Sequence, residues 1–109
     1  MSKIKIATLN IKGLNNKSKV QRTLTLLKSY KLDIILLQET NLTDTATRNF
    51  LSQQWNYDSI WSSKTAILAG NKKIQFSNSQ EFLDGRILQT RTSFQYYNYL
   101  ITNIYTSPR

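Results

Sequence analysis

The sequence predicts an α/β fold in which a mixed sheet carries one main helix and a short second helix. Within about the first 40 residues, a strand, a helix and a fully apolar strand follow one another, which is the order of a βαβ unit. After residue 57 the pattern changes to short strands separated by turns. With 109 residues, the chain is long enough for one domain and too short for two.

Two strands frame the predicted βαβ unit. Ile4 and Ile6 alternate with lysines, which is the period-two pattern of a strand. The run Ile34 to Leu37 is apolar at every position, which is typical of a strand buried on both faces of a parallel or mixed sheet. Asn and Gly residues between positions 10 and 16 predict a loop after the first strand.

The segment between these strands predicts an amphipathic helix from about Lys17 to Tyr30. Its apolar residues recur at intervals of three and four and would form one buried stripe, made of Val20, Leu24, Leu27 and Tyr30. Basic residues lie off this stripe, namely Lys17, Lys19, Arg22, Lys28 and Lys31. Asn16 and Ser18 are the candidate N-caps, because their side chains can accept a hydrogen bond from the first turn.

The second part of the chain predicts a short helix and five strands. The helix spans about 43 to 54, with Asp44 as its cap, and the strands span 57–62, 65–69, 74–82, 86–92 and 97–105. Gly70-Asn71-Lys72 and Asp84-Gly85 are predicted hairpin turns, so we expect one antiparallel meander. Because no further helix is predicted, we expect one apolar face of this sheet to be uncovered.

Composition excludes several classes of function. The chain has no cysteine and no histidine, so it cannot build disulfides, zinc–thiolate sites, cysteine nucleophiles or histidine general bases. No apolar run approaches the ~18 residues of a membrane span, and the first residues lack a signal-peptide core. We therefore expect an intracellular protein with no membrane partner. Fifteen Lys and Arg against six Asp and Glu give a net charge of +9, which favours a nucleic-acid partner.

Candidate catalytic residues lie at the ends of predicted strands. Glu39 directly follows the buried strand and Asn10 ends the first strand, so they would meet at one edge if the strands are neighbours. A carboxylate beside an amide suits Mg²⁺ and a phosphate oxygen, although one carboxylate needs other ligands to complete the shell. The alternative is an exposed Glu39 that caps a loop. Tyr105, at the end of the last strand, could donate to a phosphate or be a half-buried structural tyrosine.

Five basic residues and one asparagine form a second set of candidates. Lys12, Asn15, Lys17, Lys19 and Arg22 lie in the first loop and helix and could follow a phosphate backbone, and Arg86 is a further candidate for phosphate contact. The competing interpretation is the solvent-exposed face of an amphipathic helix. The remaining carboxylates, Asp33, Asp44, Asp58, Glu81 and Asp84, are interpreted as turn, cap or solvated residues.

Three segments, in order, resemble motifs of the endonuclease/exonuclease/phosphatase superfamily. They contain Asn10 with Gly13-Leu14, then Gln38-Glu39-Thr40, then Asn103-Ile104-Tyr105. The order and spacing are most similar to the endonuclease domain of LINE-type (non-LTR) retrotransposons. The similarity covers essentially the whole chain but only the first half of the family domain. We therefore expect residues 1–109 to be a single partial domain, truncated after the strand that ends near Tyr105.

This resemblance implies the N-terminal half of a DNase I-like, two-sheet α/β sandwich that nicks DNA with a divalent metal. By position, Asn10 would orient the scissile phosphate, Glu39 would bind Mg²⁺ or Mn²⁺, and Tyr105 would contact the phosphate. The family's later Asp-x-Asn, Asp and Ser-Asp-His motifs have no counterpart here. The C-terminal half is thus an expected partner, and we expect no nuclease activity from this chain alone. A nuclear location is implied by the resemblance only.

Two alternatives remain open at this point. The chain could be a non-catalytic, basic nucleic-acid-binding module, or a truncated product without function. The segment Lys64-Thr65-Ala66-Ile67 also departs from the family, whose members have a glycine-rich start to this strand. No feature of the sequence sets the oligomeric state or the target-site preference.

Overall fold

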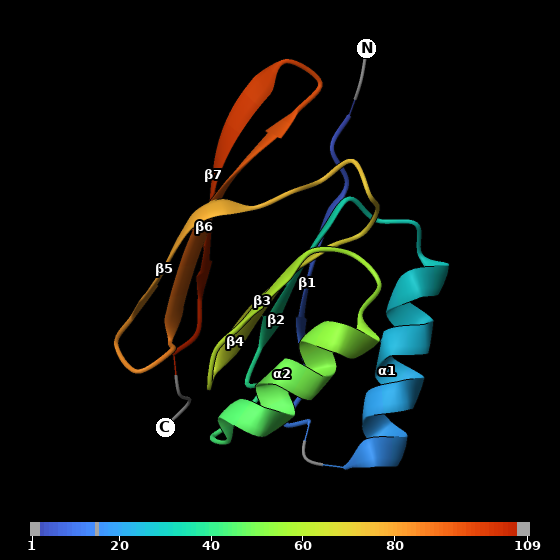
Figure 1. Ribbon diagram of the computed structural model, residues 1–109, viewed down its shortest axis with the longest axis vertical. Coiled ribbons are helices and arrows are strands. Elements are labelled where there is room, and N and C mark those ends of the chain that lie inside the picture. The colour runs from blue at the N-terminus through green and yellow to red at the C-terminus, as the bar shows by residue number, and fades with distance from the viewer. Residues whose placement is uncertain (1–2, 15, 107–109) are drawn as a thin grey trace.

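Two β-sheets pack face to face, and both helices cover the outer face of the first sheet (Figure 1). The structure is a computed structural model that describes residues 3–14 and 16–106. The first sheet has the strand order β1-β2-β4-β3, and the second has the order β5-β6-β7. No helix in the described ranges is long and apolar enough to cross a membrane.

The predicted βαβ unit is confirmed. Strand β1 (Ile6–Asn10) and strand β2 (Ile34–Gln38) pair in parallel, and helix α1 (Lys17–Ser29) connects them. Asn16 is the N-cap, and its side-chain oxygen accepts from the Lys19 N–H at 3.2 Å. Val20, Leu24 and Leu27 are buried as predicted.

The prediction of Tyr30 as part of the buried stripe is wrong. Tyr30 is the C-cap of α1 and its side chain is 59% exposed. Lys31, with φ of 51°, turns the chain away immediately afterwards. Helix α1 therefore ends at Ser29, and the Tyr30 side chain does not continue the buried stripe.

The second helix and two further strands complete the first sheet. Helix α2 (Thr45–Gln54) has Asp44 as its N-cap, as predicted, and the Asp44 carboxylate accepts from the Ala46 N–H at 3.1 Å. Strands β3 (Ser59–Trp61) and β4 (Thr65–Ala69) form an antiparallel hairpin. Strand β4 also pairs antiparallel with β2, which places β2 and β4 at the centre of the sheet.

The remaining strands form a separate sheet, so the prediction of one meander is wrong. Strands β5 (Ser77–Phe82), β6 (Ile87–Phe94) and β7 (Tyr97–Ile104) are antiparallel neighbours, and Asp84-Gly85 forms the predicted turn between the first two. The segment around Gly70 is not a hairpin, because it carries the chain from the first sheet to the second. A Cβ atom at Gly70 would lie 1.7 Å from the Leu32 carbonyl oxygen, so glycine is required by a close backbone approach.

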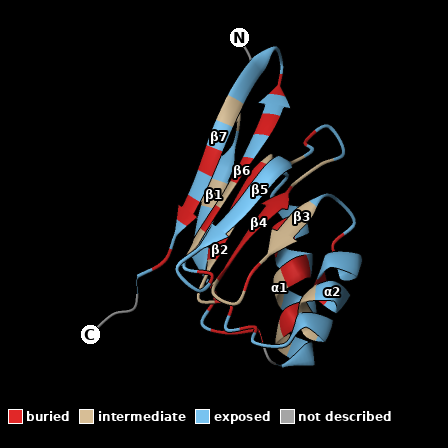
Figure 2. Ribbon diagram, turned by 60° about the vertical axis from the view of Figure 1, so that its left-hand side comes forward, coloured by how far each residue is buried: buried red, intermediate tan, exposed pale blue. Residues whose placement is uncertain are grey.

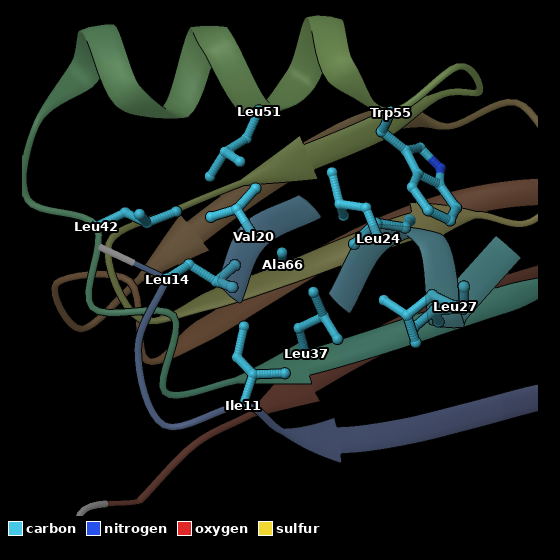
Figure 3. Packing of buried hydrophobic residues seen from close by; sticks show 12 residues of the cluster. Ile11, Leu14, Val20, Leu24, Leu27, Leu37, Leu42, Leu51, Trp55 and Ala66 are labelled. Carbon is cyan, nitrogen blue, oxygen red and sulfur yellow. The ribbon is translucent and has the colours of Figure 1, made fainter. Parts of the chain in front are cut away.

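Alternate residues of the central strand serve two different cores. Ile35 and Leu37 of β2 pack under the helices with residues such as Leu24 and Leu51 (Figure 3). Ile34 packs on the other face, against Leu88 and other residues of the second sheet. Figure 2 shows that buried residues fill β4 and alternate positions of β6. The expectation of a large uncovered sheet face is therefore wrong, because the chain's own last three strands cover it.

Candidate functional site

Asn10 and Glu39 lie at the same edge of the first sheet, as predicted. Asn10 is opposite Gln38 in the parallel register, and Glu39 is the next residue of the chain. Hydrogen bonds continue beyond the strands: the Ile11 N–H donates to the Gln38 carbonyl at 3.1 Å, and the Gly13 N–H donates to the Glu39 carbonyl at 2.7 Å. The loop after β1 is thus joined residue by residue to the loop after β2, which places the backbones of Asn10 and Glu39 at one edge of the sheet.

Glu39 has a strained backbone. Its φ of 60° lies in the left-handed region, which is disfavoured by about 1–2 kcal/mol for a residue with a Cβ atom. The bond from Gly13, which itself has φ of 92°, holds this conformation in place. Eight other non-glycine residues in the described part of the chain, such as Lys31 and Gln95, also have positive φ. The pairing of the two loops, and not the strain alone, therefore distinguishes Glu39.

Asn10 forms a turn with its own loop. Its side-chain oxygen accepts from the Lys12 N–H at 3.1 Å, and the residue is exposed. This contact uses the amide oxygen and not the amide nitrogen, which carries two donors. Those donors are the chemical group by which an asparagine binds a phosphate oxygen.

Strand β7 reaches the same end of the molecule. The Asn103 side-chain nitrogen donates to the carbonyl oxygens of Leu37 and Ala66 at 2.9 Å each. Tyr105 follows two residues later and thus leaves β7 beside the end of β2. Its side chain is only 8% exposed, and no hydrogen bond joins its hydroxyl group to Asn10 or Glu39 in the described part of the chain. A contact between Tyr105 and phosphate therefore stays a prediction.

Two turns continue this edge toward the second sheet. The Ser62 hydroxyl donates to the Gly85 carbonyl at 3.0 Å, and the Ser63 hydroxyl donates to the Asp84 carbonyl at 2.8 Å. The Thr40 N–H donates to the Lys64 carbonyl at 3.1 Å. We define the strand-end rim as the four segments that these bonds connect, namely residues 11–14, 38–42, 62–65 and 83–86. It contains Glu39 and adjoins Asn10.

The residues that connect the rim were not singled out by sequence reasoning. Ser62 and Thr65 carry no local motif, although both are buried and hydrogen-bonded to Gly85. Lys64 was noted only as a departure from the family pattern. In the sequence, the polar run 62–65 between two short strands indicates a turn. It does not indicate that this turn bonds to the distant turn at Gly85.

The described residues do not fit a complete metal site. No group of three or more His, Cys, Asp or Glu side chains within residues 3–14 and 16–106 is arranged to hold an ion. Glu39 is the carboxylate of the candidate site, and an amide such as Asn10 is a weak additional ligand. A Mg²⁺ or Mn²⁺ ion at this place would need ligands from other residues.

Other carboxylates have the structural roles that were predicted for them. Asp33 accepts from the Lys5 N–H at 2.7 Å and from the Asn71 side chain at 2.9 Å. The pKa of Asp44 is lowered, first by the hydrogen bond from the Thr47 hydroxyl and then by the bond from the Ala46 N–H. These carboxylates are engaged in holding loops and a helix end, away from Glu39.

The described candidates for nucleic-acid contact lie either on the rim (Lys12 and Arg86) or on α1 (Lys17, Lys19 and Arg22). Lys12 is exposed on the rim, and the Lys19 ammonium donates to the Lys12 carbonyl at 3.1 Å. Lys17 and Arg22 are exposed on α1, while Asn15 lies outside the described residues. Arg86 is exposed on the rim, and its carbonyl accepts from the Tyr105 N–H at 2.8 Å.

A groove of about 700 Å³ lies between α1 and α2. Its floor includes Val20, Leu24 and Leu51, which Figure 3 shows packed together between the helices and the sheet. None of Asn10, Glu39 and Tyr105 lines this groove. The candidate site is therefore an edge formed by strand ends and turns.

Solved structures share this fold. An AP endonuclease from Archaeoglobus fulgidus matches with a TM-score of 0.72 and 20% identity, over 94% of this chain and 41% of that one. TDP2 from Caenorhabditis elegans matches with a TM-score of 0.69 and 21% identity, over 97% and 36%. A humanized D. rerio TDP2 matches with a TM-score of 0.67 and 18% identity, over 91% and 45%. No protein-family model and no curated protein matches the sequence.

These likenesses show the fold of the chain. It is the mixed α/β, DNase I-like fold of the AP endonuclease and TDP2 structures, so the predicted fold class is confirmed. The chain spans less than half the length of the solved structures that it matches. These likenesses therefore define the fold of this chain and do not define its activity, substrate or partners.

Proposed function

We propose that this chain is the first part of a DNA-processing nuclease domain of the endonuclease/exonuclease/phosphatase superfamily. The observation that supports the proposal is the hydrogen-bonded pairing of the loops after β1 and β2, the segments that contain Asn10 and Glu39 or adjoin them. One TDP2 structure with this fold is complexed with a single-strand DNA product, which supports DNA as the ligand. The three ordered motifs favour a LINE-type retrotransposon origin, and a nuclear location belongs to the same proposal.

The roles of the residues follow from their chemistry. The Asn10 amide would donate to an oxygen of the scissile phosphate, and the Glu39 carboxylate would provide one ligand for Mg²⁺ or Mn²⁺. Tyr105 would contribute a hydroxyl donor. Since the described residues do not complete a metal site, the remaining ligands would come from a further segment. We therefore propose that the 109 residues alone do not cleave DNA.

Nicking of a supercoiled plasmid tests the catalytic part of this proposal. The chain, the Glu39→Ala variant and a no-protein control are incubated in parallel with MgCl₂ or MnCl₂. We expect no difference among the three. Metal-dependent nicking by the unmodified chain that Glu39→Ala abolishes would show that the site is already complete.

A binding assay tests the second part of the proposal, that the ligand is DNA. The net charge of +9 predicts a measurable affinity for a fluorescent single-stranded oligonucleotide in EDTA, and the affinity should fall steeply as salt increases. Fluorescence anisotropy gives the dissociation constant at each salt concentration. An absence of binding at low salt would contradict the proposed function.

A non-catalytic binding module is the second candidate, because α1 carries an exposed basic face. It predicts that neutralising Lys17, Lys19 and Arg22 weakens DNA binding, whereas Glu39→Ala leaves binding unchanged. The nuclease proposal instead places the DNA contact at the strand-end rim. The same anisotropy assay distinguishes the two.

A further inference from the structure

Lys64 lies on the strand-end rim directly beside the loop that carries Glu39. Its carbonyl oxygen accepts from the N–H of Thr40, the residue after Glu39, at 3.1 Å. The neighbouring Ser63 carbonyl accepts from the Leu42 N–H at 2.8 Å. Two backbone hydrogen bonds thus fix the turn between β3 and β4 against the candidate catalytic loop.

The Lys64 ammonium is oriented by a neutral partner. Its Nζ donates to the side-chain oxygen of Asn41 at 3.2 Å. An amide oxygen carries no net charge, so this bond positions the ammonium without neutralising it. A lysine ammonium has three donors, and the bond to Asn41 uses one of them.

Asn41 is suited to this position. Its φ of 53° lies in the left-handed region, which asparagine adopts more readily than most residues. The loop can therefore present the Asn41 oxygen to Lys64 with little strain at that residue. Because Lys64 is partly buried, its side chain loses less freedom on binding a ligand than a fully exposed lysine would.

Other cations lie along the same rim. Lys12 belongs to the loop joined to Glu39, and Arg86 follows the turn that receives hydrogen bonds from Ser62 and Thr65. With Lys64, the rim therefore carries three cations, Lys12, Lys64 and Arg86, and two carboxylates, Glu39 and Asp84. The positive charge is arranged along a line that crosses from the first sheet to the second.

We propose that Lys64 binds a backbone phosphate of a nucleic-acid strand next to the phosphate held at Asn10 and Glu39. This inference rests on the proposed function and specifies the path of its substrate. The strand follows the rim from Lys12 past Lys64 to Arg86, and it does not follow the basic face of α1. A lysine ammonium is a suitable point-charge ligand for phosphate, and such contacts position the strand without reading its sequence.

The test measures how DNA affinity depends on salt for four proteins. They are the unmodified chain, Lys64→Gln, Lys64→Arg and the control Lys72→Gln, which removes an exposed lysine from the connection between the sheets. The ligand is a fluorescent single-stranded oligonucleotide, in EDTA, between 50 and 300 mM KCl. Gln can still donate to Asn41, so the fold is expected to persist, and a thermal melt checks it.

The expected result is specific to position 64. Lys64→Gln should weaken binding by roughly three- to fivefold, the effect of one exposed charge pair. It should also lower the slope of log affinity against log salt by about 0.7, the value for one phosphate contact on a single strand. Lys64→Arg should keep both quantities near those of the unmodified chain, and Lys72→Gln should change them less than Lys64→Gln.

Two outcomes would contradict different statements. Equal effects of Lys64→Gln and Lys72→Gln, with normal binding by the unmodified chain, would overturn the role of Lys64 and leave the proposed function standing. An absence of binding by the unmodified chain would overturn the proposed function itself. If Lys64→Gln lowers the melting temperature, Lys64→Arg decides, because it keeps the positive charge at this position. A loss of slope in Lys64→Arg as large as that in Lys64→Gln, in a variant that melts normally, would contradict the inference.

Discussion

The side chains of Gln38 and Asn103 meet between the two sheets, with 2.8 Å between the Gln38 Nε2 and the Asn103 Oδ1. Asn103 also donates to the carbonyls of Leu37 and Ala66. One buried amide on β7 therefore bonds to both central strands of the first sheet. Because Gln38 directly precedes Glu39, this contact holds the second sheet against the candidate site.

Replacing Asn103 with leucine should destabilise the protein strongly. Leucine has nearly the same size but leaves two buried carbonyls and the Gln38 amide without this partner, which costs about 3 kcal/mol in the free energy of unfolding. Urea denaturation measures the loss. Asn98→Ala, at an exposed position of the same strand, is the control and should change stability by less than about 0.5 kcal/mol. Similar losses for both variants would show that the Asn103 contacts contribute little.

Replacing Glu39 with asparagine should stabilise the protein. Asparagine tolerates the left-handed backbone at this position, so we expect a gain of about 0.5–1 kcal/mol. Lys31→Asn is the matched control, since Lys31 has φ of 51° and lies away from the rim. Chemical denaturation of both variants gives the comparison. A loss of stability confined to Glu39→Asn would support the alternative in which Glu39 is a structural loop residue.

Two glycine substitutions should separate backbone strain from steric overlap. Gly13 and Gly85 both have positive φ, of 92° and 85°. A Cβ atom at Gly13 would lie 3.8 Å from the nearest side-chain atom, that of Asn41, whereas one at Gly85 would lie 2.5 Å from the Ser63 Oγ. We expect Gly13→Ala to cost about 1 kcal/mol from conformation alone, and Gly85→Ala to cost at least about 1 kcal/mol more from overlap.

The free energies of unfolding of the two alanine variants check this expectation. The chemical shifts of Ser62 and Ser63 should change only in Gly85→Ala. The reason is that their hydroxyl groups donate to the carbonyls of Gly85 and Asp84. Equal costs and unmoved shifts would mean that the two turns are not in contact in solution.

The Asp44 cap should make helix α2 sensitive to acid. The pKa of Asp44 in the folded state is lowered, so its stabilising contribution is present above the pKa of the unfolded chain. The contribution is lost as the pH falls through the lowered folded value. Melting temperatures between pH 2.5 and 6 should thus favour the unmodified chain over Asp44→Asn at pH 6, with a difference that shrinks toward acid. Thr47→Val removes the hydrogen bond that lowers the pKa most and should weaken this dependence; an unchanged dependence would contradict its assignment.

The local elements of this protein were determined by its sequence alone. Helix α1 begins at the predicted residue and ends one residue before the predicted end, and strand β2 contains the whole continuous apolar run. Asn16 and Asp44 cap their helices, as their side-chain chemistry favours. The position of Asn10 and Glu39 at one edge of the first sheet was also predictable. Parallel strands joined by one helix place their carboxyl ends at a common edge, so a local pattern was sufficient.

Only the tertiary structure decided how the later strands divide between two sheets. Alternation of apolar and polar residues looks the same whichever sheet receives a strand, and the close approach of Gly70 to Leu32 has no local signature. The same holds for Lys64 and Asn103, whose partners at Asn41 and Leu37 are distant in the chain. Hydrogen bonds between distant residues depend on packing of the whole domain, and this packing is what sets Lys64 beside Glu39.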